Sequence, residues 1–95
     1  MTPSPLQPTL DFYRRDRCAP CDEARLALQQ VLEARARRGD RIPRVRYVDV
    51  AAKPELEASF GARVPVMALG TDELSLTVSE RSIGLFLDRV LGRVA

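Results

Sequence analysis

The sequence predicts one α/β domain with a mixed four-stranded sheet and helices on both faces, in the order β-α-β-α-β-β-α. Segments rich in β-branched and aromatic residues alternate with segments of helical periodicity, and Pro54 and Gly61 frame a short helix. A helix between the first two strands makes these strands parallel. A short turn between the last two strands makes that pair antiparallel, so the sheet is mixed.

The elements are expected in the following order. Residues 1–8 contain three prolines and form an extended lead-in, so the folded domain spans 9–95. The alternation of Leu74, Leu76 and Val78 predicts that these side chains share one face of the fourth strand. The last helix has the clearest amphipathic pattern. The predicted strands are 9–14, 44–50, 64–69 and 73–78, and the predicted helices are 19 or 20 to 38, 54–60 and 80–91.

Composition excludes several classes of protein. Apolar residues make up 45% of the chain and charged residues 29%, which is typical of a soluble globular domain. No apolar run approaches the roughly 20 residues that span a bilayer, and the N-terminus lacks the pattern of a secretory signal. The arginines are not accompanied by aromatic residues in a nucleic-acid-binding pattern. We therefore expect a cytoplasmic monomer that binds neither membranes nor nucleic acids.

The two cysteines, Cys18 and Cys21, are the main candidates for chemistry. They are separated by two residues, and a disulfide that closes so short a loop would stabilise the fold little. They lie where the predicted first strand ends and a helix begins. In a cytoplasmic chain such a pair indicates redox or metal chemistry. The chain has no histidine, which excludes Cys/His catalysis and Cys/His zinc sites, and two thiolates alone fall short of the four usual zinc ligands. No metal site is predicted within one chain.

The position of the pair predicts different roles for the two sulfurs. Cys18 falls at the helix N-terminus, where unpaired N–H groups carry partial positive charge, and Pro20 suits the first helical turn. A thiol at such a place ionises more easily, and the thiolate is the nucleophile in disulfide exchange. Cys21 heads the apolar stripe of the helix and is expected to be sheltered. Cys18 would attack a substrate disulfide, and Cys21 would then resolve the mixed disulfide.

Charged residues near the cysteines offer further candidates. Arg14, Arg15 and Arg17 stand just upstream and would stabilise the Cys18 thiolate if their side chains turned toward it. Residues 1–47 carry 10 basic and 6 acidic groups, a net charge of +4. This basic half is either a solvated arginine-rich surface or a face that attracts an acidic partner surface or glutathione carboxylates. Asp11 and Asp49 would be proton acceptors for Cys21 or simply solvated residues at strand ends, and we assign neither a catalytic role.

Pro65 follows Val64 inside a strand-like run, where a proline loses a ladder hydrogen bond. Two interpretations are open at this point. Pro65 either begins the third strand with an ordinary trans bond, or the Val64-Pro65 bond is cis, a rare geometry that indicates a functional role.

The Cys18-Ala19-Pro20-Cys21 motif after the first strand, and Val64-Pro65 before the third, together resemble the thioredoxin superfamily. The small size resembles its glutaredoxin-like branch, over the segment 10–91. The resemblance implies a thioredoxin-like (glutaredoxin-like) fold and a thiol-disulfide oxidoreductase. It implies that Cys18 attacks, that Cys21 resolves, and that Pro65 is a cis-proline opposite them. It also implies that the backbone of Val64 binds the substrate.

The chain departs from its relatives in ways that affect its partners. Typical glutaredoxins have Cys-Pro-Tyr-Cys, a threonine where Val64 stands, and a Gly-Gly-acidic segment that has no counterpart between Gly70 and Glu80. Thioredoxins usually have tryptophan where Arg17 stands, a position that we include among the substrate-binding candidates. The expected substrates are disulfides of proteins or small molecules. No bound cofactor is expected, and either glutathione or a reductase of the thioredoxin-reductase type would supply the electrons.

Two alternatives to the oxidoreductase remain. The domain would be a catalytically weak binding or scaffold domain if the cysteines were unreactive. It would be a metal or iron-sulfur carrier if two chains together supplied four thiolates.

Overall fold

Four strands form one mixed sheet in the order β2-β1-β3-β4, in which β1 is parallel to β2 and antiparallel to β3, and β3 is antiparallel to β4. The computed structural model describes residues 7–94, so residues 1–6 of the predicted lead-in 1–8 lie outside the described range. The carbonyl oxygen of Pro8 accepts a hydrogen bond from the Arg44 N–H (2.8 Å). The elements are β1 (Thr9–Arg14), α1 (Ala19–Arg38), β2 (Arg44–Asp49), the 3-10 helix η1 (Val50–Ala52), α2 (Pro54–Phe60), the 3-10 helix η2 (Gly61–Arg63), β3 (Val66–Leu69), β4 (Asp72–Ser75) and α3 (Glu80–Leu91).

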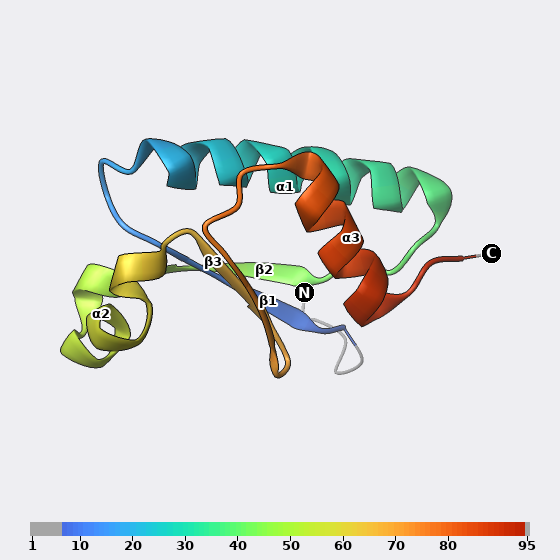
Figure 1. Cartoon of the computed structure of the whole chain (residues 1–95). Coiled ribbons are helices and arrows are strands. Elements are labelled where there is room, and N and C mark those ends of the chain that lie inside the picture. Colours follow the sequence, from blue (N-terminus) through green and yellow to red (C-terminus); the bar gives the residue numbers. More distant parts are fainter. Residues whose placement is uncertain (1–6, 95) are drawn as a thin grey trace.

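The helices lie on both faces of the sheet, as predicted (Figure 1). Leu10 and Phe12 of β1 point toward α1 and α3 and are completely buried in one apolar core. Tyr13 points to the opposite face because side chains alternate along a strand, and its ring stacks on that of Phe60 at the end of α2 (3.9 Å between ring centroids). The core consists of Leu10, Phe12, Ala24, Ala27, Leu28, Val31, Met67, Leu69, Ile83, Phe86 and Leu87.

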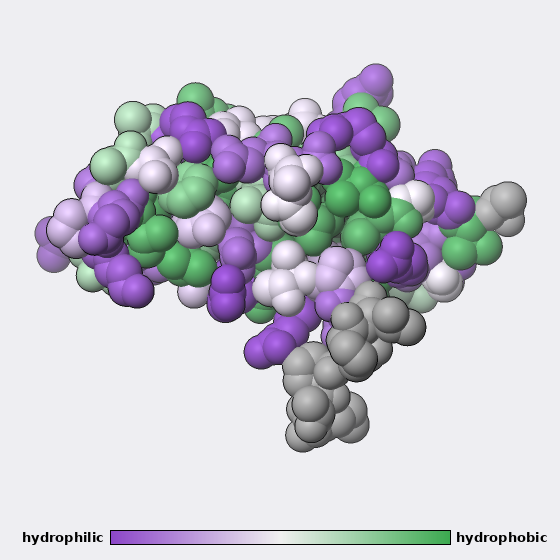
Figure 2. All heavy atoms as spheres, turned by 90° about the horizontal axis from the view of Figure 1, so that it is seen from below, coloured by the Kyte–Doolittle hydropathy of each residue, from purple (hydrophilic) through white to green (hydrophobic). Residues whose placement is uncertain are grey.

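The sheet face opposite α1 is more polar than the core face. Asp11 accepts a hydrogen bond from Arg46 Nε across β1 and β2 (2.7 Å), and Arg63 Nη1 donates to Glu73 Oε1 (3.1 Å). Figure 2 views the molecule from this side and shows hydrophilic and hydrophobic residues interspersed over it. The apolar residues that hold the domain together are therefore concentrated between the sheet and the layer of α1 and α3.

Both long helices begin and end where the sequence predicts, because local signals determine their ends. Gly39 ends α1 with a φ of 79°, and its N–H donates to the Ala36 carbonyl (3.1 Å). The side chain of Ser79 caps α3 by accepting a hydrogen bond from the Ser82 N–H (3.2 Å).

Three of the predicted strands had wrong boundaries. The second strand ends at Asp49, not residue 50, because the Asp49 carboxylate accepts from the Ala51 N–H (2.9 Å) and starts η1. Regular pairing of the third strand begins at Val66, after Pro65, which has no N–H to donate. The fourth strand covers Asp72–Ser75 instead of 73–78 because Leu76 has a φ of 60°, which ends the extended chain.

A buried arginine joins the C-terminal ends of α1 and α3. Arg35 is completely buried and donates three hydrogen bonds, each 2.8 Å long, to the Arg41 carbonyl, the Asp88 carboxylate and the Gly92 carbonyl. The guanidinium therefore has a partner on each of its three sides, which a buried charge requires.

Asp40 completes this junction. Its carboxylate accepts from the Val94 N–H (2.6 Å) and from Arg38 Nε (2.8 Å). The Val94 N–H, followed by Arg38, lowers the pKa of Asp40 below its ordinary value. The end of α1 opposite the cysteines is thus fixed to the C-terminal segment by two charged side chains.

Replacing Arg35 tests how much this junction contributes to the free energy of unfolding. We predict that Arg35→Leu lowers the free energy of unfolding by about 3 kcal/mol, since it leaves the partly buried Asp88 carboxylate and two carbonyls without their donor. Urea denaturation measures the loss. Arg37→Leu, at an exposed position of the same helical turn, should change the stability by less than about 0.5 kcal/mol. Equal effects of the two substitutions would contradict a structural role for Arg35.

Candidate functional site

The two cysteines form a disulfide at the N-terminus of α1, with their Cα atoms 5.2 Å apart. Cys18 is the N-cap of the helix, with an extended backbone (φ −120°, ψ 98°), and its Sγ accepts a hydrogen bond from the Cys21 N–H (3.2 Å). Its carbonyl oxygen accepts from the Asp22 N–H (3.1 Å). Cys18 Sγ thus lies in the electrostatic field of the helix N-terminus and in contact with one of its unpaired donors.

The exposure of the two sulfur-bearing residues differs as predicted. Cys21 is 2% exposed and lies next to the core, whereas Cys18 is only half-buried. Cys18 is therefore more accessible from solvent than Cys21.

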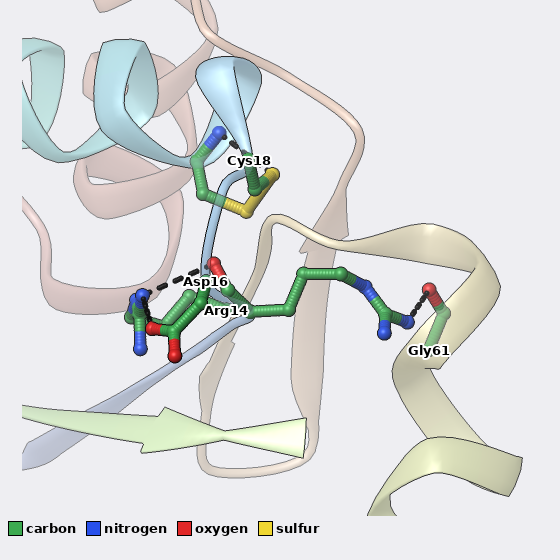
Figure 3. The surroundings of a disulfide bond; sticks show 6 residues. Arg14, Asp16, Cys18 and Gly61 are labelled. Atoms are coloured by element: carbon green, nitrogen blue, oxygen red, sulfur yellow. Dashed lines mark hydrogen bonds and ion pairs between the residues drawn. A yellow bond between two sulfur atoms is a disulfide. The ribbon is translucent and has the colours of Figure 1, made fainter. Parts of the chain in front are cut away.

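The interpretation that Arg14 and Arg15 stabilise the Cys18 sulfur was wrong. Arg14 Nη2 donates to the Asp16 carboxylate (2.8 Å) and to the Arg15 carbonyl (3.1 Å), and Figure 3 shows this group turned away from the disulfide. Arg15 extends toward α2, where it binds the Glu57 carboxylate and the Gly61 carbonyl (2.7 Å). Both side chains thus serve the structure around the cysteines and not the sulfur itself.

Arg17, which directly precedes Cys18, is exposed and has a φ of 55°. Within residues 7–94 its side chain makes no hydrogen bond or ion pair. Its guanidinium is therefore available in this part of the chain for an incoming partner.

The loop that leads to Cys18 is fastened to α2 by Arg15. Besides its bond to the Gly61 carbonyl, Arg15 forms a two-point ion pair with Glu57. The hydrogen bonds from Arg15, together with its positive charge, lower the pKa of Glu57 below its ordinary value. The stack of Tyr13 on Phe60 attaches the end of α2 to the same strand, β1. The loop that leads to Cys18 is thus held against α2 by Arg15.

The Val64-Pro65 peptide bond is cis, as the resemblance implied. Pro65 is buried and leads directly into β3, and Tyr13 near the end of β1 pairs with Val66 at the start of β3. Because these strands are antiparallel, Pro65 lies at the end of the sheet from which the chain continues to Cys18. Val64 is extended (φ −64°, ψ 141°) and half-buried at the same end.

Asp11 and Asp49 have other partners than Cys21. Asp11 binds Arg46 on the sheet face opposite α1, and Asp49 caps η1.

Residues 7–94 contain neither a cluster of metal ligands nor a membrane-spanning helix. No cluster of three or more Cys, Asp or Glu side chains among residues 7–94 is arranged to hold a metal ion. A metal carrier would therefore need ligands beyond this part of the chain, such as thiolates of a second copy. No helix in the same range is long and apolar enough to cross a membrane.

The sequence matches a known family model, and the fold is similar to that of a solved structure. The family model described as "Glutaredoxin-like domain (DUF836)" matches residues 9–88, and the chain belongs to this family. The fold is similar to that in the X-ray structure of Northeast Structural Genomics target protein XcR50 from X. campestris. That chain is 29% identical, with a TM-score of 0.70 over 85% of this chain and 97% of the other. No curated protein matches. The predicted thioredoxin-like fold and the glutaredoxin-like resemblance are confirmed.

The ion pair between Arg15 and Glu57 predicts a response to acid. Because the pKa of Glu57 is lowered in the folded state, its stabilising contribution is present above the ordinary Glu pKa of about 4.3 and is lost as the pH falls through the lower folded value. We expect amide exchange in residues 15–18 and 57–61, corrected for intrinsic exchange, to accelerate several-fold across this range.

Two variants check the cause of this response. Arg15→Ala should give the faster exchange already at pH 7, whereas Arg44→Ala, an exposed arginine at the other end of the sheet, should not. Protection that is identical in Arg15→Ala and the unaltered chain would show that the ion pair does not hold the loop.

Proposed function

We propose that this chain is a thiol-disulfide oxidoreductase that reduces disulfides of proteins or small molecules through Cys18 and Cys21. The observation that carries the proposal is the disulfide at the start of α1, with a half-buried cysteine at the N-cap and a buried cysteine one turn into the helix. Membership of a glutaredoxin-like family supports the same chemistry. A scaffold domain would have no need of this difference in exposure.

The reaction starts from the dithiol form. The Cys18 thiolate attacks one sulfur of the substrate disulfide, a bond forms between the two sulfurs, and the second substrate sulfur leaves as a thiolate that takes up a proton. The N-terminus of α1, with the Cys21 N–H nearest to the sulfur, stabilises the negative charge on Cys18 Sγ before the attack.

The second step returns the substrate. Cys21, deprotonated, attacks Cys18 Sγ, the mixed disulfide breaks, and the remaining substrate sulfur leaves and is protonated. Two electrons have then passed from the cysteine pair to the substrate, and the Cys18–Cys21 disulfide of the present structure is the product form. Because both sulfurs belong to one helical turn, the second attack needs only a local movement.

The surroundings of the pair supply the binding surface in this proposal. The backbone of Val64 pairs with an extended substrate segment, with Pro65 beneath it, and Arg17 offers a positive charge on the side of Cys18. Reduction of the product disulfide requires an external dithiol or two glutathione molecules, and we propose one of these two sources. This direction of exchange suits a reducing compartment, which is why we propose a cytoplasmic location.

Trapping of the mixed disulfide tests this function. We expect Cys21→Ser, reduced and then mixed with oxidised glutathione or an oxidised peptide, to retain one substrate molecule on Cys18, because the resolving thiol is absent. Cys18→Ser should react at least tenfold more slowly, because Cys21 is buried. Intact-mass analysis over time measures both reactions.

The unaltered chain should form the internal disulfide in the same mixture without accumulating the adduct. Equal reaction rates of the two variants would contradict the assigned roles. Unreactive thiols in both variants and in the unaltered chain would favour a scaffold domain.

A further inference from the structure

Leu76 lies beside Pro65 at the end of the sheet that carries the cysteines. It follows the last residue of β4, and its N–H donates to the Pro65 carbonyl (2.9 Å). In Figure 1 the segment from β4 to α3 and the start of β3 lie at the end of the sheet where α1 begins. Leu76 therefore belongs to the rim of the proposed site, although the sequence predicted it as a residue within the fourth strand.

The backbone of Leu76 is unfavourable for a leucine. Its φ is 60°, in the left-handed region that glycine and asparagine adopt readily and that is strained for a bulky side chain. The side chain gains little packing in return, because Leu76 is 66% exposed. Val78, two residues later, is 37% exposed. Neither local conformation nor the core explains a leucine here, and strained residues of this kind cluster at functional sites.

The charges next to Leu76 are already paired. Arg63, which precedes Val64, donates from Nη1 to the Glu73 carboxylate (3.1 Å) and to Ser75 Oγ (2.8 Å), and from Nη2 to the Ser59 carbonyl (2.9 Å). Its charge is balanced within the domain and is not directed at a ligand carboxylate. The rim on the side of β4 thus offers the exposed Leu76 side chain and no unpaired cation from Arg63, which suits an apolar peptide better than a small acidic disulfide such as oxidised glutathione.

We propose that Leu76 is a specificity-determining residue that contacts an apolar side chain next to the cysteine of an extended protein substrate. This inference rests on the proposed function and names its substrate class, which is protein disulfides flanked by apolar residues. Val64 holds the substrate backbone in that proposal, and Leu76 adds apolar area beside it.

Two disulfide-linked peptides that differ only beside the cysteine test the proposal, one with leucine and one with serine at the flanking positions. Each is mixed at increasing concentration with pre-reduced protein, and the single-turnover rate is followed, so that no recycling system is needed. We expect Leu76→Asn to raise the half-saturating concentration of the leucine peptide roughly fivefold to tenfold, as expected for loss of an apolar contact. Its reaction with the serine peptide and with oxidised glutathione should change less than about twofold.

Two controls separate binding from folding. Asparagine adopts the left-handed region more readily than leucine, so the melting temperature of Leu76→Asn should be unchanged or higher. Ile42→Asn alters a 39% exposed apolar residue before β2, at the opposite end of the sheet, and should keep the preference for the leucine peptide.

The outcomes distinguish failure of the role proposed for Leu76 from failure of the proposed oxidoreductase function. A preference for the leucine peptide that Leu76→Asn loses and Ile42→Asn keeps supports the role of Leu76. Equal reduction of both peptides by the unaltered chain, or a preference that survives in Leu76→Asn, overturns the role of Leu76 and leaves the proposed oxidoreductase intact. Failure of the unaltered chain to reduce any of the three disulfides overturns both.

Discussion

The hydrogen bond from the Cys21 N–H to Cys18 Sγ is the interaction on which the proposed chemistry depends. It exists because α1 begins at Cys18, directly after the loop that leaves β1. A helix N-terminus at this position places one of its unpaired donors against Cys18 Sγ. The second sulfur, three residues later, falls on the buried side of the helix, so one structural element produces two unlike cysteines.

The rest of the domain keeps the start of α1 in place. The apolar core holds α1 against β1 and β3, and Arg35 and Asp40 fix its other end to the C-terminal segment. On the opposite face, Arg15 joins the cysteine loop to α2. The antiparallel pairing of β1 and β3 then brings Pro65 to the same end of the sheet. Segments that are distant in the sequence thus meet at one edge, as a site between an extended substrate and a reactive sulfur requires.

Local signals explain why much of this could be predicted from the sequence. Gly39 as a C-cap and the apolar spacing of the last helix depend only on neighbouring residues, and the helix bounds were correct. The burial of Cys21 could be predicted from the apolar spacing of the first helix, α1. The cis bond at Pro65 was left open by spacing alone, and only the resemblance decided it.

Tertiary partners explain what could not be predicted. The directions of Arg14 and Arg15 depend on Asp16, Glu57 and the Gly61 carbonyl, and nothing in the sequence pairs residue 15 with residue 57. The left-handed turn at Leu76 was missed because an alternating apolar pattern is typical of a strand, and leucine gives no sign of a positive φ.

A redox titration of the Cys18–Cys21 pair tests the central claim most directly. The purified protein is equilibrated in glutathione buffers of graded potential, its free thiols are alkylated, and intact mass counts them. We predict that the Cys18–Cys21 pair shows one reversible two-electron transition at roughly −200 to −270 mV, the range of glutaredoxins and thioredoxins. Cysteines that stay fully oxidised or fully reduced in every buffer would contradict a redox function for the site.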